Sequence, residues 1–286
     1  MNIQAFFDKN TSTITYVVSD ETTHKCAIID PVLDYDPLLG KITTNSADIL
    51  IEYIKSNALY VEWILETHIH ADHLTAAHYL KVKLGGKIAI GANITEILKF
   101  WIPIFNTSQD TPLDGSQFDY LFKDNEHFSI GSLDVKIMYT PGHTPACISY
   151  LINDAIFVGD TIFMPHMGTG RTDFPGGSAE ILYDSIQKIL QLPPETRIFT
   201  CHDCPAEGTS ALYESTVKEE KKSNILINDA ITKEEYIEKR RKRDQSITVP
   251  RLLLPAIQVN MRAGYLGKAE SNEMQYIKIP INKIGV

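Results

Sequence analysis

The segment Thr67–His73, with the sequence THIHADH, decides the fold that we expect of this chain. Its last six positions hold three histidines and one aspartate, directly after the apolar, strand-like segment 60–66. In an extended chain the side chains of His68 and His70 point the same way, whereas Asp72 and His73 lie where a helix would begin. Imidazole and carboxylate groups are common metal ligands. This segment, called the histidine loop below, is therefore predicted to bind one metal ion or two.

The composition is that of a globular protein with a sizeable core. The chain has 286 residues, of which 43% are hydrophobic and 22% charged. A formal net charge of −9 argues against a general nucleic-acid-binding protein. Positive charges do cluster at 218–222 and 239–243, but in helix-like sequence, where we interpret them as solvated helix faces.

The sequence favours a cytoplasmic protein that does not bind membranes. The segment 1–8 has neither a basic leader before a long apolar stretch nor an arginine-rich presequence. No later segment has the length of a transmembrane helix. The four cysteines do not make a disulfide framework in a chain of this length, which fits a reducing compartment. An organellar form that has already lost its presequence is the alternative.

One arrangement recurs along the chain: a strand, a short loop and then a polar side chain. Apolar and polar residues alternate over 133–139, a period of two that predicts a half-buried strand. Polar residues carried at strand ends can converge on one edge of a sheet scaffold. The residues delivered in this way, after the strands 27–29, 60–66, 133–139, 155–158 and 197–200, are Asp30, the histidine loop, His143, Asp160 and His202.

Helices are expected between these strands. Residues 73–84 have helical character and end at Gly85-Gly86, Ser178 can cap a helix that Pro193 stops, and Thr232 with Glu235 forms a capping box. Residues 249–261 are strand-like. We therefore expect one domain over 1–245 and a strand-like carboxyl-terminal extension, 246–286, packed on the same domain.

Taken in order, the histidine loop, the Pro-Gly-His-Thr of 141–144, the Gly-Asp of 159–160 and the late His202 resemble the metallo-β-lactamase superfamily. The resemblance spans about residues 10 to 205. It implies an α+β fold, the αββα sandwich, in which two mixed β-sheets lie face to face with helices outside. It also implies a metal site along one edge of the sandwich.

Three further segments are similar to the persulfide dioxygenases, also called sulfur dioxygenases: 140–147 (TPGHTPAC), 170–174 (GRTDF) and 259–264 (VNMRAG). The stretch 161–170 is similar to the bacterial β-lactamase-related hydrolase-like branch of that group. Persulfide dioxygenases resemble glyoxalase II in fold, but they bind a single ferrous ion and oxidise glutathione persulfide with dioxygen to sulfite. The resemblance therefore implies one Fe(II) per chain, with a small-molecule thiol persulfide and O2 as partners.

The same resemblance assigns residues to the site. The iron ligands, and with them the catalytic residues, would be His68, His143 and Asp160. Two imidazoles and one carboxylate form the facial triad of non-haem iron oxygenases, which leaves coordination positions open. Arg171 would hold a substrate carboxylate, because a guanidinium offers a planar bidentate fork.

Other polar residues near these motifs have less defined roles. His70, Asp72, His73 and His202 would orient the site or form a second metal site. Asp30 is expected to support the site, Cys147 is either a thiol near the site or a small core residue, and His166 is a candidate pocket-lining residue. Cys201 and Cys204 form a Cys-x-x-Cys pair without a thioredoxin-like context. Cys204 also stands where the resembled family usually has tyrosine, so a hydroxyl near the substrate is expected to be missing.

A dinuclear zinc thioester hydrolase of the glyoxalase II type, acting on S-lactoylglutathione, is the alternative. There Asp160 would bridge two Zn(II) ions and a hydroxide would attack the thioester carbonyl. Glyoxalase II carries a helical carboxyl-terminal substrate domain, whereas 247–261 is strand-like here. A metal-stabilised binding scaffold without turnover would predict a broken ligand set, and the set is intact. We expect a homodimer only because dimers are the commonest closed assembly.

Overall fold

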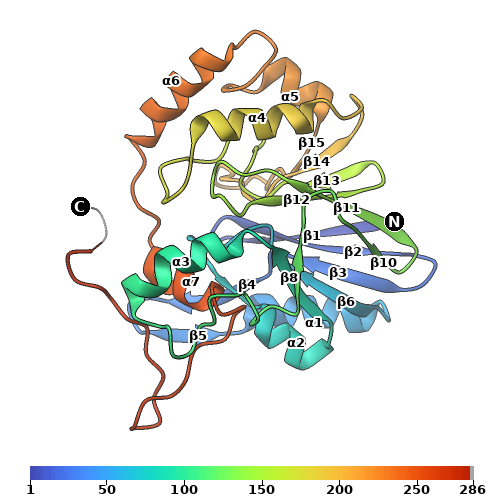
Figure 1. Ribbon diagram of the computed structural model, residues 1–286. Coiled ribbons are helices and arrows are strands. Elements are labelled where there is room, and N and C mark those ends of the chain that lie inside the picture. Colours follow the sequence, from blue (N-terminus) through green and yellow to red (C-terminus); the bar gives the residue numbers. More distant parts are fainter. Residues whose placement is uncertain (284–286) are drawn as a thin grey trace.

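The computed structural model describes residues 1–283 and has four layers, two β-sheets between two layers of helices (Figure 1). The first sheet has six strands, in the order β1 (Asn2–Asp8), β2 (Thr13–Ser19), β3 (Lys25–Ile29), β6 (Tyr60–Leu65), β8 (Lys87–Gly91) and β9 (Tyr120–Phe122). The second has six, in the order β10 (His127–Ile130), β11 (Leu133–Tyr139), β12 (Ile148–Ile152), β13 (Ala155–Phe157), β14 (Arg197–Phe199) and β15 (Glu214–Thr216). A small third sheet joins β5 (Lys41–Thr43), β4 (Val32–Asp36) and β7 (Leu74–Thr75).

Helices cover the outer face of each sheet, as Figure 1 shows. The helices on the side of the first sheet are α1 (Asn45–Ser56), α2 (Ala77–Leu84), α3 (Ile94–Phe105) and α7 (Leu253–Asn260). Those on the side of the second sheet are α4 (Ala179–Leu190), α5 (Val217–Ser223) and α6 (Lys233–Asp244). Both sheets contain parallel and antiparallel pairs. The predicted α+β sandwich of two mixed sheets is therefore confirmed.

The hydrophobic core lies in three layers because strand side chains alternate between two faces. In β2, all of whose residues are buried, Val17 packs toward the helices of the first sheet. Its neighbours Tyr16 and Val18 pack between the two sheets, together with Phe157 and Phe199 of the second sheet. Burying both faces of these strands fixes their register, and so fixes where their ends lie.

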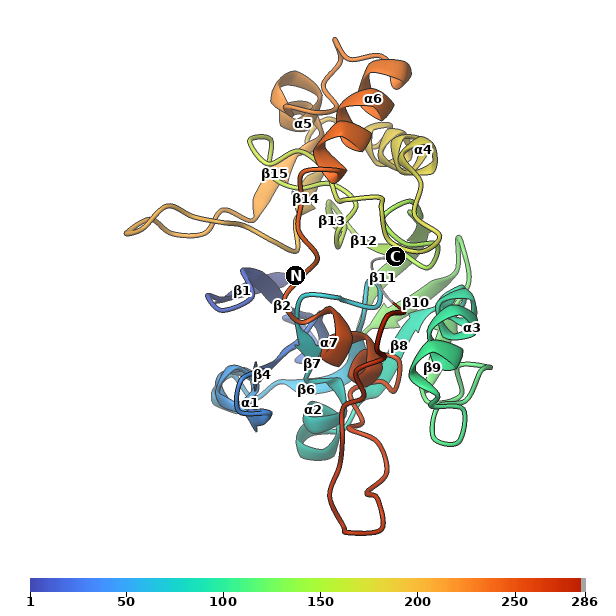
Figure 2. The same ribbon diagram turned by 90° about the vertical axis from the view of Figure 1, so that its left-hand side faces the viewer.

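The strand ends that carry polar residues meet at one edge of the sandwich. Strands β3 and β6 run parallel in the first sheet. In the second sheet β13 and β14 run parallel, and β11 runs the same way because β12 is antiparallel to both β11 and β13. The segments that follow these five strands therefore leave their sheets at the carboxyl ends. Figure 2 views the molecule from the side that faces left in Figure 1.

The prediction that residues 249–261 are strand-like is wrong, because this stretch contains α7. Leu253, Ala256 and Ile257 recur at helical spacing and are buried against the first-sheet helices. Pro255 lies in the first turn, where a missing backbone N–H does no harm. A short apolar run rich in branched residues fits a strand and a buried helix equally well by pattern alone.

Other expected elements are found close to their predicted positions. Ser178 caps α4 and Thr232 forms the predicted capping box with Glu235. The helix expected over 73–84 begins only at Ala77, because Leu74–Thr75 instead pairs as β7 with β4. Within residues 1–283, no helix combines the length and the apolar composition needed to cross a bilayer.

Glu220 predicts a pH dependence of folding stability. It is fully buried in α5, where Oε2 accepts a hydrogen bond from the Asn224 amide at 2.7 Å. Burial raises the pKa of Glu220 from its ordinary value of 4.5 to about 7. The folded state then holds this proton more tightly than the unfolded chain, so stability should fall as pH rises from about 4.5 to 7.

Urea unfolding of Glu220→Gln across this pH range tests the point. The variant should gain stability relative to the natural protein above pH 7 and lose that advantage at low pH. Glu238, an exposed glutamate of α6, changed to Gln, is the control and should show no such trend. An equal difference at both ends of the range would contradict the prediction.

Candidate metal centre

The structure brings the predicted ligands together where the strands end. The histidine loop follows β6, His143 follows β11, Asp160 follows β13 and His202 follows β14. His68, His143 and Asp160 form one group with mutually close ligand atoms, and His70, Asp72 and His73 form a second. The rings of His68 and His70 lie 4.1 Å apart, and those of His68 and His143 lie 5.0 Å apart. The two groups of possible ligands therefore lie next to each other.

Asp30 fixes the first histidine through Thr67. The Thr67 backbone N–H donates to Asp30 Oδ1, and its hydroxyl donates to Asp30 Oδ2, both at 2.8 Å. The hydroxyl has one proton, so at 3.0 Å it can only accept from Nδ1–H of His68. Nε2 of His68 is left without a proton and available to a metal ion.

Backbone carbonyls orient His143 and His202 in the same way. Nδ1 of His143 donates to the carbonyl of Arg171 at 2.8 Å, and Nδ1 of His202 donates to that of Ser12 at 3.0 Å. A carbonyl can only accept, so each ring carries its proton on Nδ1. Nε2 of His143 then faces Asp160 as a free electron pair, whereas Nε2 of His202 lies 3.2 Å from Asp160 Oδ1, where the carboxylate favours a second proton on the ring.

His70 points its Nε2 toward two buried carboxylates. Its Nε2 lies 2.9 Å from Asp30 Oδ1 and 3.5 Å from Glu66 Oε2, and all three side chains are buried. Two carboxylates beside Nε2 favour a proton there, which leaves Nδ1 for a metal ion. Glu66 also contacts the Thr75 hydroxyl. Sequence reasoning did not single out Glu66, although a carboxylate at the end of a buried strand is the same signal that identified Asp30.

The two oxygens of Asp160 face different sets of ligands. Oδ2 lies 3.6 Å from His143 Nε2 and 4.0 Å from His68 Nε2, too far for hydrogen bonds. Oδ1 lies 3.2 Å from His202 Nε2, whose other neighbour is Asp72 Oδ2 at 3.5 Å. Asp72 in turn lies 3.0 Å from Nδ1 of His73. Asp160 is thus placed between the predicted triad and a second set of possible ligands, Asp72, His73 and His202.

The pKa shifts of the triad histidines and of His202 have opposite directions. Burial, aided by the neighbouring His70, holds the pKa of His68 well below its ordinary value, and burial likewise lowers the pKa of His143. Burial also opposes the charged form of His202, but the carboxylate of Asp160 outweighs it and raises the pKa well above the usual range. Burial would raise the pKa of Asp160, yet His202 and the triad imidazoles lower it. The triad therefore presents neutral imidazoles and an ionised carboxylate, as metal ligands must be.

The site fits a metal ion. Among residues 1–283, the buried ligand atoms that lack a hydrogen-bond partner include His68 Nε2, His70 Nδ1, His73 Nε2 and Asp160 Oδ1. Buried polar atoms are rarely left unpaired, so a cation that they share accounts for them. Two ligand atoms on one ion at about 2.1 Å lie roughly 3 to 4 Å apart, and the triad distances fall in that range.

A family profile described as the metallo-beta-lactamase superfamily matches residues 10–202, two thirds of the chain. This chain belongs to the metallo-beta-lactamase superfamily. The profile begins before β2 and ends at His202, so it contains all the predicted ligands of the site. Helices α5, α6 and α7 lie beyond it.

Relatives within the superfamily have different names. Glyoxylase B2 of Dictyostelium discoideum is 51% identical over 98% of this chain and 97% of its own length. A beta-lactamase hydrolase-like protein of Agrobacterium fabrum is 48% identical over 98% of this chain, but this match covers 65% of that protein. The mitochondrial persulfide dioxygenase ETHE1 of Bos taurus is 29% identical over 92% of this chain and 88% of its own length.

Among solved structures, the crystal structure of ETHE1 from Myxococcus xanthus superposes with a TM-score of 0.74 at 27% sequence identity. The match covers 93% of this chain and all of the other. The likeness therefore extends beyond the superfamily profile and includes most of the carboxyl-terminal part of the chain.

Arg171, the predicted substrate-binding residue, has much of its hydrogen-bonding capacity in use. Its Nε and Nη2 donate to the two carboxylate oxygens of Asp173, both at 2.6 Å, and Nη1 donates to the Thr248 carbonyl at 2.8 Å. The guanidinium also lies over the Phe174 ring. Since a guanidinium has five N–H groups, about two remain for a ligand. His166, the other candidate, is 56% exposed and 3.5 Å from Asp203.

The backbone around Arg171 is held by α6. The guanidinium of Arg240, a fully buried residue, donates to the Thr169 carbonyl at 2.8 Å and pairs with Asp244. Asp244 accepts the backbone N–H and the hydroxyl of Thr172. The carbonyl that orients His143 belongs to the residue between these anchors, so α6 supports the triad from outside the profile.

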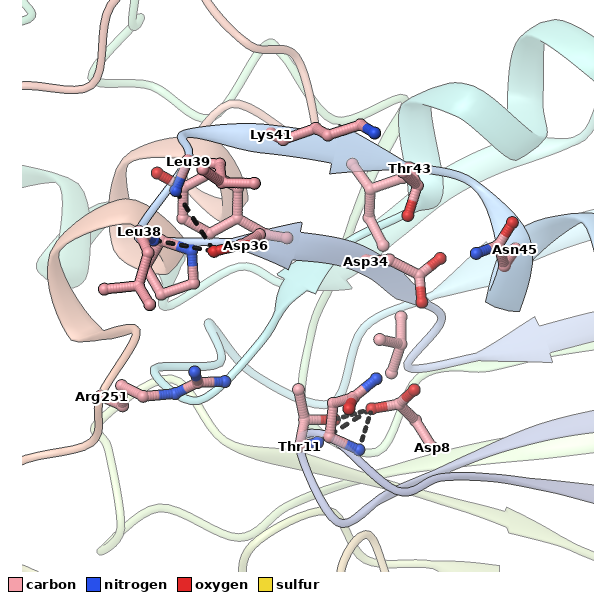
Figure 3. Close-up of a pocket in the computed structure, with 15 residues that line it drawn as sticks. Asp8, Thr11, Asp34, Asp36, Leu38, Leu39, Lys41, Thr43, Asn45 and Arg251 are labelled. Atoms are coloured by element: carbon pink, nitrogen blue, oxygen red, sulfur yellow. Dashed lines mark hydrogen bonds between the residues drawn. The ribbon is translucent and has the colours of Figure 1, made fainter.

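A hollow of about 530 Å³ is lined by residues of the segment 8–11, by β4 and the turn after it, and by Arg251 (Figure 3). Its wall includes Val32–Leu33, which pairs with Leu74–Thr75 directly after the histidine loop. Asp8 and Asp36 also line it, but each has an oxygen that caps backbone N–H groups of its own turn. Within residues 1–283, Lys41 and Arg251 form no ion pair, and Figure 3 shows the Arg251 side chain beside the hollow.

The four cysteines are free thiols, and only Cys204 is exposed. Cys147 accepts hydrogen bonds from Thr144, and burial raises its pKa to about 12. Burial likewise raises the pKa of Cys201 to about 12, and its Sγ lies 3.8 Å from Asp30. A reactive thiol is one that ionises, so neither buried residue has the properties of a reactive cysteine.

Labelling of the folded protein at pH 8 with a chromogenic disulfide reagent should therefore modify one thiol per chain quickly, and four after unfolding in guanidinium. Cys204→Ser should abolish the fast phase. Cys201→Ser is the control and should leave it intact. Fast labelling that survives in Cys204→Ser would show that a buried thiol is reachable.

Proposed function

We propose that this protein is an iron-dependent persulfide dioxygenase that oxidises glutathione persulfide, or a similar low-molecular-weight persulfide. The balanced reaction is R–S–SH + O2 + H2O → R–SH + SO3²⁻ + 2H⁺. The sulfane sulfur is oxidised, dioxygen is reduced, and the thiol carrier is released. His68, His143 and Asp160 would hold one Fe(II) per chain.

The contrast between the two ligand sets carries the proposal. In the triad, the ligand atoms point to a common region at separations of 3.6 and 4.0 Å without touching. In the second set, His202 contacts Asp160 directly at 3.2 Å and lies near Asp72. The triad therefore has the arrangement of a metal site, whereas His202 satisfies its polar atoms within the protein. This favours one metal ion held by two imidazoles and a carboxylate.

Ferrous iron supplies electrons to dioxygen when bound, whereas Zn²⁺ has no redox chemistry. The chain contributes fixed, neutral imidazoles on one side, since His68 and His143 are almost completely buried. On the other side Asp160, His202 and Arg171 are each about 12% exposed, which gives the substrate a way in. Burial of the first two keeps bulk water from competing with the substrate there.

Cationic side chains would hold the carrier's carboxylates. Arg171 retains two N–H groups, and Arg251 and Lys41 line the hollow at β4. We propose that these residues, with His166 at the rim, bind the carrier while the persulfide sulfur reaches the triad. We further propose a cytoplasmic homodimer with no membrane partner. The acidic net charge supports the absence of a nucleic-acid partner.

A dinuclear zinc thioester hydrolase is the second candidate. Two observations favour it: the second ligand set, with Asp160 between the sets, and 51% identity to a relative named Glyoxylase B2. The strand-like tail that argued against this function is in fact α7, so that argument no longer holds. Zinc would polarise a thioester carbonyl and lower the pKa of bound water.

Metal analysis and an oxygen electrode separate the two functions. Protein produced without added metal should contain one iron per chain and should consume O2 when given glutathione persulfide. Asp160→Ala, which removes the triad carboxylate, should lose both the iron and the oxygen uptake. Two zinc ions per chain, no oxygen uptake after reconstitution with Fe(II), and hydrolysis of S-lactoylglutathione would establish the second candidate instead.

Arg171→Ala should raise KM for glutathione persulfide much more than it lowers kcat, because it removes binding shared by ground and transition states. The variant keeps the backbone carbonyl that orients His143. The KM of Arg251→Ala, measured in the same assay, shows how much each of the two cations contributes to binding the thiol carrier.

Arg197→Ala is a matched control. Arg197 also forms a two-bonded pair with an aspartate, Asp154, and also lies over a phenylalanine ring, at Phe199. It belongs to β14 and contacts no predicted ligand. An unchanged KM in Arg171→Ala, or an equal rise in Arg197→Ala, would remove Arg171 from the binding site.

A further inference from the structure

We propose that Asn260, the last residue of α7, is a positioning residue of the metal centre. Its side-chain amide makes three hydrogen bonds to the segment that carries the histidines. Nδ2 donates to the carbonyl of His70 at 2.9 Å and to that of His73 at 2.8 Å. Oδ1 accepts from the backbone N–H of Thr75 at 2.8 Å.

These bonds substitute for regular secondary structure. Between Leu65, where β6 ends, and Leu74, where β7 begins, the chain is neither helix nor strand. Such a segment lacks the repeating backbone bonds that fix a helix or a sheet. Asn260 holds both backbone carbonyls that bracket the turn from His70 to His73. The directions of these two imidazoles therefore depend on a residue 187 and 190 positions away.

The helix that presents Asn260 is itself rigidly placed. Asn260 is only 2% exposed, and Ala256, Ile257 and Val259 of the same helix belong to the core beside the first sheet. Just beyond, Gly264 has φ +87° and approaches so closely that a Cβ there would lie 2.9 Å from the backbone nitrogen of His78. Arg262 is anchored to Asp110 at 2.8 Å. Packing of the helix before Asn260 and of the segment after it therefore fixes the position of its side-chain amide.

The consequence for metal binding follows from the geometry. Asn260 touches the backbone of two potential ligands and none of their side chains, so it acts through the orientation of their imidazoles. Residues that orient metal ligands typically change metal affinity roughly 10–100-fold when removed. His70 and His73 lie outside the triad, so their orientation acts directly on a metal ion held by their own group and on the triad through the loop that also carries His68. Helix α7 lies outside the superfamily profile.

Titration of the full-length apoprotein with Co²⁺ alone tests the role, with visible absorption as the readout. Asn260→Ala removes all three hydrogen bonds. Asn260→Asp keeps an acceptor for Thr75 but loses both donors and places a carboxylate against two carbonyls. Gln258→Ala is the matched control, since Gln258 is a buried amide of the same helix that bonds the Leu254 and Lys278 backbone instead.

Both Asn260 variants should bind Co²⁺ roughly 10–100-fold more weakly, with an altered absorption spectrum. Gln258→Ala should keep the natural affinity and spectrum even where urea unfolding shows a similar loss of stability. An affinity and spectrum in Asn260→Ala equal to those of Gln258→Ala would overturn the proposal. So would failure of both Asn260 variants to fold while the control folds, because Asn260 would then serve the fold as a whole.

Discussion

The buried carboxylate of Asp30 is the interaction on which the rest of the site depends. Asp30 directly follows β3, and its carboxylate accepts two hydrogen bonds from Thr67 after β6 and lies 2.9 Å from Nε2 of His70. Burial alone would raise the pKa of Asp30, but His70 and the Thr67 bonds lower it and keep the carboxylate charged. A buried charge is tolerated only when it is paired and hydrogen-bonded. The histidine loop therefore has to fold around Asp30, and this fixes which nitrogen His68 and His70 present.

The metal centre also depends on the fixed relation between the two sheets. The Ile148 N–H donates to the carbonyl of Thr67 at 3.0 Å, which joins the start of β12 to the histidine loop. The Tyr150 hydroxyl donates to the Glu66 carbonyl at 2.8 Å, a second link across the sandwich. Predicted ligands from the second sheet, His143 and Asp160, thus meet predicted ligands from the first at distances that suit one shared ion.

Segments outside the superfamily profile complete this arrangement. Helix α6 holds the backbone on both sides of Arg171, whose carbonyl orients His143, and α7 holds the histidine loop through Asn260. The polypeptide between the two helices passes Arg171, which donates to Thr248. The carboxyl-terminal part of this chain is therefore integral to the site, not an addition to it. This matters for function, because relatives of this chain carry the names of a glyoxylase and of a persulfide dioxygenase.

The sequence by itself determined where the candidate ligands gather. The strand-loop-ligand arrangement predicted that polar residues meet at one sheet edge, and capping residues located α4 and α6, because these signals are local. The sandwich and the choice of His68, His143 and Asp160 as a triad came from the resemblance to known families. Sequence reasoning failed for α7, where a short apolar run is ambiguous, and it did not reveal Glu66 or Asn260 as parts of the site. Only the tertiary structure decided which ring nitrogen each histidine presents, how far Arg171 is already engaged, and what fixes the histidine loop. Those properties come from contacts between residues up to 190 positions apart, which local spacing does not encode.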